Sequence, residues 1–311
     1  MSIVTIDCQY VLPQTAAAYL IEDHGELAFV ENNTAHAVPI LLKTLRDFAF
    51  SKEAVRYIII THVHLDHAGG TSALLKHCPN ATVIAHPKAA RHVIDPSRLV
   101  QSAEAVYGKD RFAKMFGKID PVPKEKVYSP ADKEALDFGK SKLHFLYTRG
   151  HANHHFCIWY SKENVIFTGD TFGLAYPALQ NGTKPFLYAT TSPTDFDYHE
   201  AVKSVQKIVE TKSQCAYLTH FGAWHNIPLG AEMMMVSLEK AKEIFDLLLQ
   251  TQEFDGSEGS LAYTKLLHFY RREFAKRGLE HLMHTPWIRM DLELNAQGIA
   301  FAAQRIFSKG K

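Results

Sequence analysis

The chain has 311 residues, of which 46% are hydrophobic and 22% charged, and its formal net charge is +1. A chain of this size and composition can bury a sizeable core without disulfides, and the near-neutral charge argues against a dedicated nucleic-acid or membrane-surface protein. No apolar run approaches the roughly 18 residues of a membrane span. The N-terminus also lacks a basic segment followed by an apolar one, so we expect a cytoplasmic protein.

The first 95 residues alternate between strand and helix patterns. Short apolar segments predict strands at 17–20, 27–30, 56–60 and 82–85. Apolar residues at helical spacing predict helices at 37–50 and 71–77, and Pro87 is expected to open another. The segment 96–130 holds two helical stretches and ends in a turn-rich sequence, which indicates a helical insertion.

Strand signals return after the insertion at 142–148, 156–160, 164–168 and 216–219. Between them lie an aromatic-rich loop at 172–193 and a helix at 195–211, for which Thr194 is the expected N-cap. Long amphipathic helices are predicted at 231–250 and 261–277. The segment 291–307 fits a strand–turn–strand, or a helix from Ile299. We therefore expect a layered α/β domain at 1–225 and a helical C-terminal extension at 226–311 that packs on it.

The cysteines are few and scattered. Cys8, Cys78, Cys157 and Cys215 form no C-x-x-C pair, and the last two lie in apolar runs. This pattern indicates reduced, buried cysteines rather than disulfides or zinc thiolates.

Four of the predicted strands each end close to a histidine or an aspartate. His62 follows the strand at 58–60, His151 follows 143–147, Asp170 follows 165–168, and His220 follows 217–219. Sheet enzymes gather their chemistry on loops at one edge of the sheet. Taken singly, each residue has another interpretation. His151 could lie in a surface loop, Asp170 could be an ordinary turn residue, and His220 could be packed in the core. Together they predict one shared cleft.

The first of these strands is followed by the sequence His62-Val63-His64-Leu65-Asp66-His67. His62 and His64 can point at one cation, while Asp66 and His67 can turn towards a second. Imidazole and carboxylate groups suit zinc, and also iron and manganese. The cluster supplies more ligands than one tetrahedral ion needs, so we expect two divalent metal ions, with zinc favoured.

These segments resemble the signature of the metallo-β-lactamase-fold hydrolases. The resemblance rests on Thr61–Gly70, Gly150-His151, Gly169-Asp170 and His220-Phe221-Gly222, and it covers about Ala16 to Gly222. It implies a four-layer αββα sandwich with the metals at one end of two packed sheets. It also implies ligand roles: His62, His64 and His151 for the first metal, Asp66, His67 and His220 for the second, and Asp170 as the bridge.

The segments 150–155 and 291–298 look most like a branch related to lactonases and glyoxalase II. The family usually has an Asp-Thr-Gly-like segment after its early strands, where this chain has Val30-Glu31-Asn32-Asn33-Thr34. Glu31 is expected to replace that aspartate and to support the metal ligands from behind. His155 is a second candidate for such a supporting role.

The expected reaction is hydrolysis of an ester-like bond, a lactone or a thioester, by a metal-bridging hydroxide. Asp66 is expected to pass a proton to the leaving group as well as binding metal. Two alternatives stay open: a non-haem di-iron protein that binds or senses oxygen or acts in redox chemistry, and a mono-iron sulfur dioxygenase. The family's di-iron members usually carry glutamate where this chain has His64, which favours hydrolysis.

Aromatic residues on the 172–193 loop suggest a substrate pocket or an interface. Phe172, Tyr176 and Tyr188 are the candidates, and Tyr107, Phe112, Met115 and Phe116 of the insertion could cover them. Simple local packing fits these residues equally well. We expect a small-molecule substrate, no nucleic-acid or membrane partner, and a possible homodimer.

Overall fold

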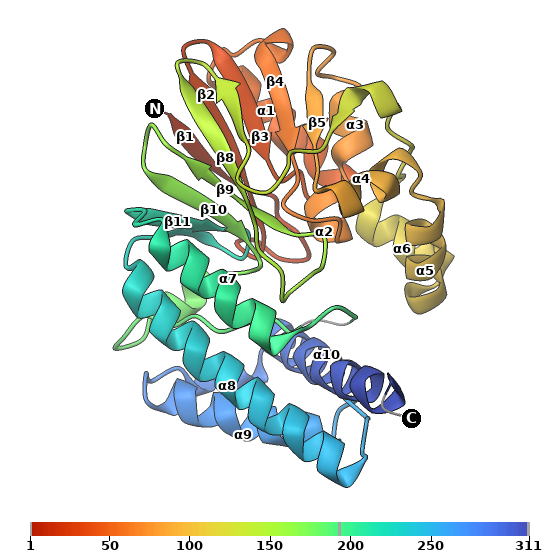
Figure 1. Cartoon of the computed structure of the whole chain (residues 1–311), viewed down its shortest axis with the longest axis vertical. Helices are drawn as coiled ribbons and strands as arrows, with labels where there is room; N and C mark the ends of the chain where they lie inside the picture. The colour runs from red at the N-terminus through yellow and green to blue at the C-terminus, as the bar shows by residue number, and fades with distance from the viewer. Residues whose placement is uncertain (1, 192–193, 310–311) are drawn as a thin grey trace. The chain divides into compact units, whose positions relative to one another are not determined.

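The computed structural model describes residues 2–191 and 194–309, apart from the side chains of 106 and 107, and it divides into two units (Figure 1). The first unit contains Met1–Tyr147, His154–Gly169 and Ser213–His225. The second contains Thr148–Asn153, Asp170–Lys212 and Asn226–Lys311. The predicted boundary at 225, and the packing of the C-terminal extension on the first domain, stay predictions.

Two six-stranded sheets form the first unit. The first sheet has the order β1-β2-β3-β4-β5-β6, antiparallel from β1 to β3 and parallel from β3 to β6. Its strands are β1 (Ile3–Asp7), β2 (Ala17–Asp23), β3 (Glu26–Val30), β4 (Val55–Ile59), β5 (Thr82–Ile84) and β6 (Val127–Tyr128).

The second sheet has the order β12-β11-β10-β9-β8-β7, and within it only β10 and β11 run parallel. Its strands are β7 (Ala135–Phe138), β8 (Ser141–Tyr147), β9 (Phe156–Tyr160), β10 (Val165–Gly169), β11 (Cys215–Leu218) and β12 (Gly222–Trp224).

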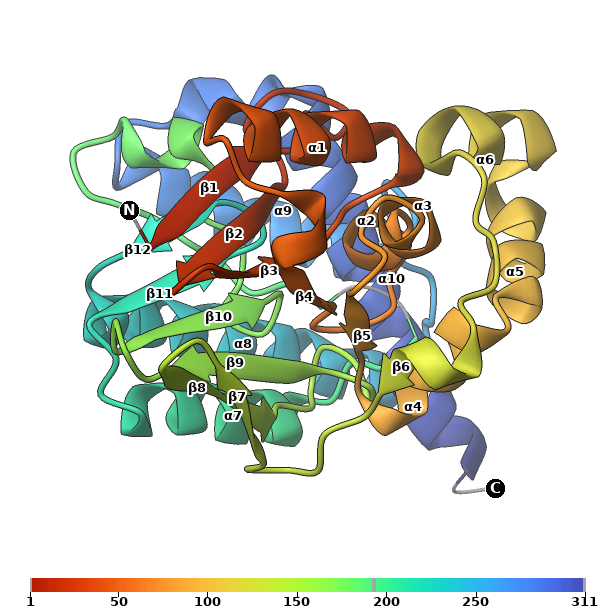
Figure 2. The same ribbon diagram turned by 90° about the horizontal axis from the view of Figure 1, so that it is seen from above.

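Alternation along the strands explains how the first sheet is buried on both faces. Leu27 and Phe29 of β3 pack with the helices, whereas Ala28 and Val30 pack with residues of the second sheet, such as Phe145. Figure 2 shows the two sheets face to face with α1 on the outer side of the first. The predicted α/β sandwich of two sheets is confirmed.

Six helices belong to the first unit: α1 (Val38–Asp47), α2 (Leu65–Ala68), α3 (Thr71–Leu75), α4 (Pro87–Ile94), α5 (Ser97–Tyr107) and α6 (Lys109–Phe116). The helices α5 and α6 match the helical stretches predicted in the insertion. The end of that segment was not predicted to be a strand, but Val127 and Tyr128 pair with β5 and extend the first sheet.

The second unit is helical and contains α7 (Tyr198–Glu210), α8 (Ile227–Thr251), α9 (Leu261–Ala275) and α10 (Pro286–Lys309). The prediction of Thr194 as an N-cap is wrong: α7 begins at Tyr198, and the Asp197 carboxylate accepts a hydrogen bond from the Glu200 amide, 3.1 Å away. The strand–turn–strand predicted at 291–307 is also wrong, because α10 runs through it. Among the described helices, none is both long and apolar enough to cross a membrane.

All four cysteines lie in the described part of the chain, are buried, and form no disulfide, as predicted. Burial raises the pKa of the Cys8 thiol to about 12 and that of Cys78 to about 11. These thiols therefore stay protonated at neutral pH, which is the form that does not bind metal.

A buried carboxylate joins the two sheets at the turn after β2. Asp23 is fully buried and accepts hydrogen bonds from Lys162 Nζ (2.8 Å) and Ser141 Oγ (2.6 Å). Burial acts to raise the pKa of Asp23, but the hydrogen bonds from Lys162, Ser141 and His24 outweigh it and hold that pKa well below its usual range.

We expect Lys162→Met to lower the free energy of unfolding at pH 7 by about 1–3 kcal/mol, because it takes a donor from a buried carboxylate. The folded-state pKa of Asp23 is depressed, so its stabilisation is present above the unfolded value of about 3.9 and is lost as the pH falls below it. In urea denaturation, the free energy of unfolding that Lys162→Met loses relative to the wild type should be smaller at pH 3 than at pH 7. Lys140→Met is the matched control, since the exposed Lys140 meets Asp23 through its backbone amide alone.

Candidate metal centre

The loop after β4 brings together the first histidines of the predicted site. His62 is fully buried, and the centroid of its ring lies 4.4 Å from that of His64 and 4.1 Å from that of His67. The short helix α2 begins directly after His64, whose carbonyl accepts hydrogen bonds from the amides of His67 and Ala68. This first turn brings Asp66 and His67 back beside His62.

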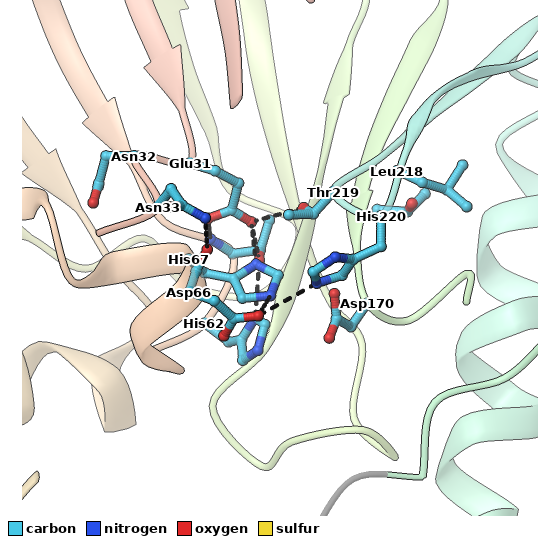
Figure 3. Close-up of polar contacts among 12 residues, drawn as sticks. Glu31, Asn32, Asn33, His62, Asp66, His67, Asp170, Leu218, Thr219 and His220 are labelled. Atoms are coloured by element: carbon cyan, nitrogen blue, oxygen red, sulfur yellow. Dashed lines mark hydrogen bonds and ion pairs between the residues drawn. The ribbon is translucent and has the colours of Figure 1, made fainter. Parts of the chain in front are cut away.

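Asp66, His67 and His220 are one of two groups among the described residues of the first unit that could hold a metal ion, and Glu31, His62 and His67 are the other (Figure 3). In each group, one ligand atom from each residue lies within 4.8 Å of the other two. The Asp66 Oδ2 atom is 3.7 Å from His67 Nε2 and 3.4 Å from His220 Nε2. The structure thus brings the β11 exit, which carries His220, to the β4 exit.

The other ring nitrogen of each histidine is held by an acceptor. His67 Nδ1 lies 3.2 Å from Glu31 Oε1, and His220 Nδ1 lies 2.6 Å from the Thr15 carbonyl oxygen. A carboxylate and a carbonyl can only accept, so each Nδ1 carries the proton and each Nε2 presents its lone pair. Neutral imidazoles oriented in this way, beside a carboxylate, fit a divalent metal ion.

The segment after β3 supports the same group from behind. The Asn33 side-chain amide donates to the Asp66 carbonyl (2.8 Å), and the Asn32 and Asn33 backbone amides donate to the His67 carbonyl (3.0 and 3.1 Å). Glu31 was predicted from the sequence to act here, but Asn33 and Thr15 were not. Neither carries a local signal, because both act through contacts with residues far along the chain.

Two further histidines come from the segment before β9. The His155 ring is fully buried and its centroid is 5.1 Å from that of His62, while the Phe156 amide donates to the Thr61 carbonyl (3.0 Å). His154 was not predicted, yet its ring is stacked 6.1 Å from His62 and lies 5.8 Å from His64. Its only signal in the sequence is its position beside His155.

His151 and Asp170 belong to the second unit. Both are buried, and His151 Nε2 lies 3.5 Å from Asp170 Oδ2. Asp170 follows β10 directly in the chain, and His151 lies in the connection between β8 and β9. Their binding of metal together with the histidines of the first unit stays a prediction.

The three aromatic residues predicted to line a pocket pack within the second unit. Tyr188 is fully buried, donates to Asp291 Oδ2 (2.8 Å), and has its ring centroid 5.0 Å from that of Tyr270. Tyr176 stacks edge-on against Trp287, and Phe172 is fully buried. These contacts agree with local packing, and a role in binding substrate stays a prediction.

The insertion contacts the metal loop through Leu65. Phe112 and Phe116 form an apolar cluster with Leu65, against which Tyr10 and Met115 pack. A cavity beside Leu65 has a volume of ≈ 20 Å³, which is room for about one water molecule. This cluster therefore packs Leu65, the residue between His64 and Asp66, against the insertion.

The family model of the metallo-beta-lactamase superfamily matches residues 15–220. Metallo-beta-lactamase fold-containing protein ST1585 of Sulfurisphaera tokodaii is 29% identical over 182 residues, which cover 58% of this chain and 65% of that protein. A hydroxyacylglutathione hydrolase of Francisella philomiragia is 30% identical over 114 residues, covering 37% of this chain and 32% of the hydrolase. The match to each of these relatives thus spans less than two thirds of its length.

Solved structures share the fold. The crystal structure of ST1585 superposes with a TM-score of 0.66 and 20% identity, covering 96% of this chain and 98% of that one. A chemotaxis sensor described as a peroxy diiron species superposes with a TM-score of 0.53 and 12% identity over 77% of this chain and 93% of the sensor. The family model covers well over half of the chain and includes every predicted ligand from His62 to His220, so the chain belongs to the metallo-β-lactamase superfamily.

Proposed function

We propose that the protein is a dinuclear metal-dependent hydrolase that cleaves an ester-like bond, either a lactone or a thioester. The observation that carries the proposal is the convergence of Asp66, His67 and His220, with both histidines held at Nδ1 so that Nε2 faces Asp66. The relative from Francisella is named for hydrolysis of hydroxyacylglutathione, which is a thioester, and this agrees with the proposed substrate class.

In the proposed site, His62, His64 and His151 would hold one cation, Asp66, His67 and His220 a second, and Asp170 would contact both. When bound, two divalent cations, zinc in our proposal, supply a hydroxide near neutral pH and polarise the substrate carbonyl. The protein's own contribution is to fix the imidazole orientations through Glu31 and the Thr15 carbonyl. The Asp66 side chain keeps about a quarter of its surface exposed, so it can also carry a proton to the leaving group.

A panel of lactones, thioesters and phosphodiesters, tested with purified protein and defined metals, tests the proposal. We expect two metal ions per chain, hydrolysis of a lactone or thioester, loss of that activity on chelation, and recovery when zinc is restored. Two irons with an oxygen-sensitive optical band and no esterase activity would contradict it and favour the di-iron alternative. Activity with a single iron on a sulfur substrate would favour the dioxygenase.

A small-molecule substrate, a cytoplasmic location and a homodimer complete the proposal. They come from the sequence and its family resemblance. Sedimentation of the purified protein tests the homodimer directly, since a species of one chain mass at micromolar concentration is incompatible with it.

A further inference from the structure

Arg305, near the end of α10, holds the stretch of chain at 194–196, just before α7. Its Nη1 atom donates to the Thr194 carbonyl (2.6 Å), and its Nη2 atom donates to the Phe196 carbonyl (3.0 Å). A guanidinium group presents its donors in a rigid planar fork, so one side chain fixes both carbonyls. Arg305 therefore ties the C-terminal helix to the 194–196 stretch.

The backbone of the 194–196 stretch is strained. Thr194 has a φ of +105°, a conformation that a β-branched residue rarely adopts. Such residues persist only where the surrounding structure fixes them, and they gather at functional sites. Asn295, also on α10, holds the chain three residues earlier, because its Oδ1 atom accepts from the Thr191 amide (2.7 Å) and its carbonyl accepts from the Thr191 hydroxyl (2.9 Å). The helix α10 thus supports this part of the chain at two points.

The 194–196 stretch in turn holds the loop at 149–153, which contains His151. The Asp195 Oδ2 atom accepts from the Asn153 amide (3.0 Å). The Asp195 Oδ1 atom lies 3.9 Å from Arg305 Nη1, so the guanidinium also orients the carboxylate that receives this amide. The Arg149 guanidinium donates to Asn153 Oδ1 (2.8 and 3.1 Å) and closes the loop on itself. A shift of Asn153 would therefore be passed to His151.

The start of this loop is held separately, by α7. Ser204 Oγ donates to the Arg149 carbonyl (2.6 Å). A Cβ on Gly150 would lie 2.3 Å from the backbone nitrogen of Ala201, so the loop lies flat against the helix there and has no room to move. The end of the loop, in contrast, is held through a carboxylate that Arg305 orients. Arg305 therefore acts on the end of the loop and not on its start.

We infer that Arg305 is a positioning residue for His151, acting through Asp195 and the strained backbone at Thr194. The inference rests on the proposed dinuclear site, in which His151 binds the first metal ion. His151 Nε2 lies 3.5 Å from Asp170 Oδ2, and this pairing depends on where the loop holds the imidazole. The inference gives α10 a role in metal binding, although α10 carries no proposed ligand.

Metal affinity, measured by competition with a chromophoric chelator, tests the inference without an activity assay. Arg305→Met removes the guanidinium and keeps an apolar side chain. We expect it to raise the dissociation constant of one metal ion about tenfold, the lower end of the range for groups behind a ligand. The other ion should be unaffected, since its proposed ligands lie in the first unit and are held by Glu31 and the Thr15 carbonyl. Arg305→Lys keeps the charge but cannot bridge both carbonyls, so it should show a smaller loss at the same ion.

Arg289→Met serves as the control. Arg289 lies on the same helix and also pairs with a carboxylate, that of Glu258 at 2.9 Å, which belongs to the segment between α8 and α9. We expect this variant to keep both metal affinities. Hydrogen exchange in the metal-free proteins adds a direct readout. The Asn153 amide should exchange faster in Arg305→Met than in the wild type, and at the wild-type rate in Arg289→Met.

Asp195→Ala tests the route from Arg305 to the loop. If Arg305 acts through Asp195, the double variant should bind metal no more weakly than the weaker single variant, because both changes break one chain of contacts. Additive losses would overturn the inference. So would metal affinities in Arg305→Met that match those of Arg289→Met, or an equal loss at both metal ions, which indicates general destabilisation. If Arg305→Met does not fold, Arg305→Lys carries the same comparisons.

Failure of the proposed function gives a different result. If the wild-type protein binds two metal ions but hydrolyses nothing in the panel, the function is wrong, while the selective loss in Arg305→Met still supports the positioning role. If the wild-type protein binds a single ion and Arg305→Met leaves its affinity unchanged, the dinuclear proposal and the role of Arg305 fail together.

Discussion

Replacing Asp66 with asparagine is expected to lower kcat/KM for the best substrate of the panel by about 10²–10⁴-fold, the usual contribution of a positioned acid or base. The structure gives two reasons. Asp66 Oδ2 lies within 4 Å of Nε2 of both His67 and His220, so its charge belongs to the proposed second metal site. Its side chain is also more exposed than those of the two histidines, so it can meet a substrate.

Metal analysis of the same variant separates these two roles. A drop from two metals per chain to one indicates that Asp66 acts chiefly as a ligand. If the variant keeps two metals per chain but its pH–rate profile loses the acidic or the basic limb, Asp66 acts chiefly in proton transfer. Asp66→Glu is the matched control, because it keeps the charge and tests whether position alone matters. Full activity of Asp66→Asn would contradict the mechanism and favour the mono-iron alternative, which does not need this side chain.

The proposed ligands could be identified from the sequence because their signal is local. His62 to His67 form one short motif after a run of isoleucines, and His220 follows another buried strand. The strands β4 and β11 belong to the two different sheets of the sandwich, and both end at the site where Asp66 meets His220. This reasoning needs only strand positions, and the predicted strands match β4 and β11 to within a residue or two.

The groups that orient the ligands could not be predicted in the same way. Thr15 lies 205 residues from His220 in sequence, and Thr219, whose hydroxyl donates to Glu31, lies 188 residues from it. A threonine or a peptide carbonyl has no distinctive pattern, and only the tertiary contact between the start of β2 and the residues after β11 places it. Glu31 was predicted because it departs from the family's aspartate, which supplied a signal that Asn33 and Thr15 lack.

The wrong prediction for 291–307 has a similar cause. Asn295 reads as a turn residue and Asp291 as the start of a strand, yet both are buried on α10. Asn295 accepts from the Thr191 amide (2.7 Å) and donates to the Tyr270 hydroxyl (3.0 Å), while Asp291 accepts from Tyr188. A polar residue inside a helix is tolerated when tertiary partners satisfy it. Here Thr191 and Tyr188 come from a segment about a hundred residues earlier, and Tyr270 comes from α9.

Gly169→Ala is expected to be among the most damaging single methyl additions in the first unit. Gly169 ends β10 with a φ of +50°, and a Cβ there would lie 2.4 Å from His155 Nε2 and 2.5 Å from Thr61 Oγ1. Both neighbours are fully buried, so neither can move into solvent. The left-handed conformation costs an alanine about 1–2 kcal/mol, and overpacking adds about 1–3 kcal/mol.

Gly25→Ala separates these two contributions. Gly25 lies in the turn between β2 and β3 with a φ of +83°, and a Cβ there would meet nothing within 4 Å. We expect this variant to lose only the conformational part, about 1–2 kcal/mol of the free energy of unfolding, in urea denaturation of the metal-free protein. The Gly169 variant should lose the packing part as well. Because Thr61 also holds His62, only Gly169→Ala should weaken metal binding. Equal destabilisation by the two alanines, with metal affinity unchanged in both, would show that Thr61 and His155 are not packed tightly around the end of β10.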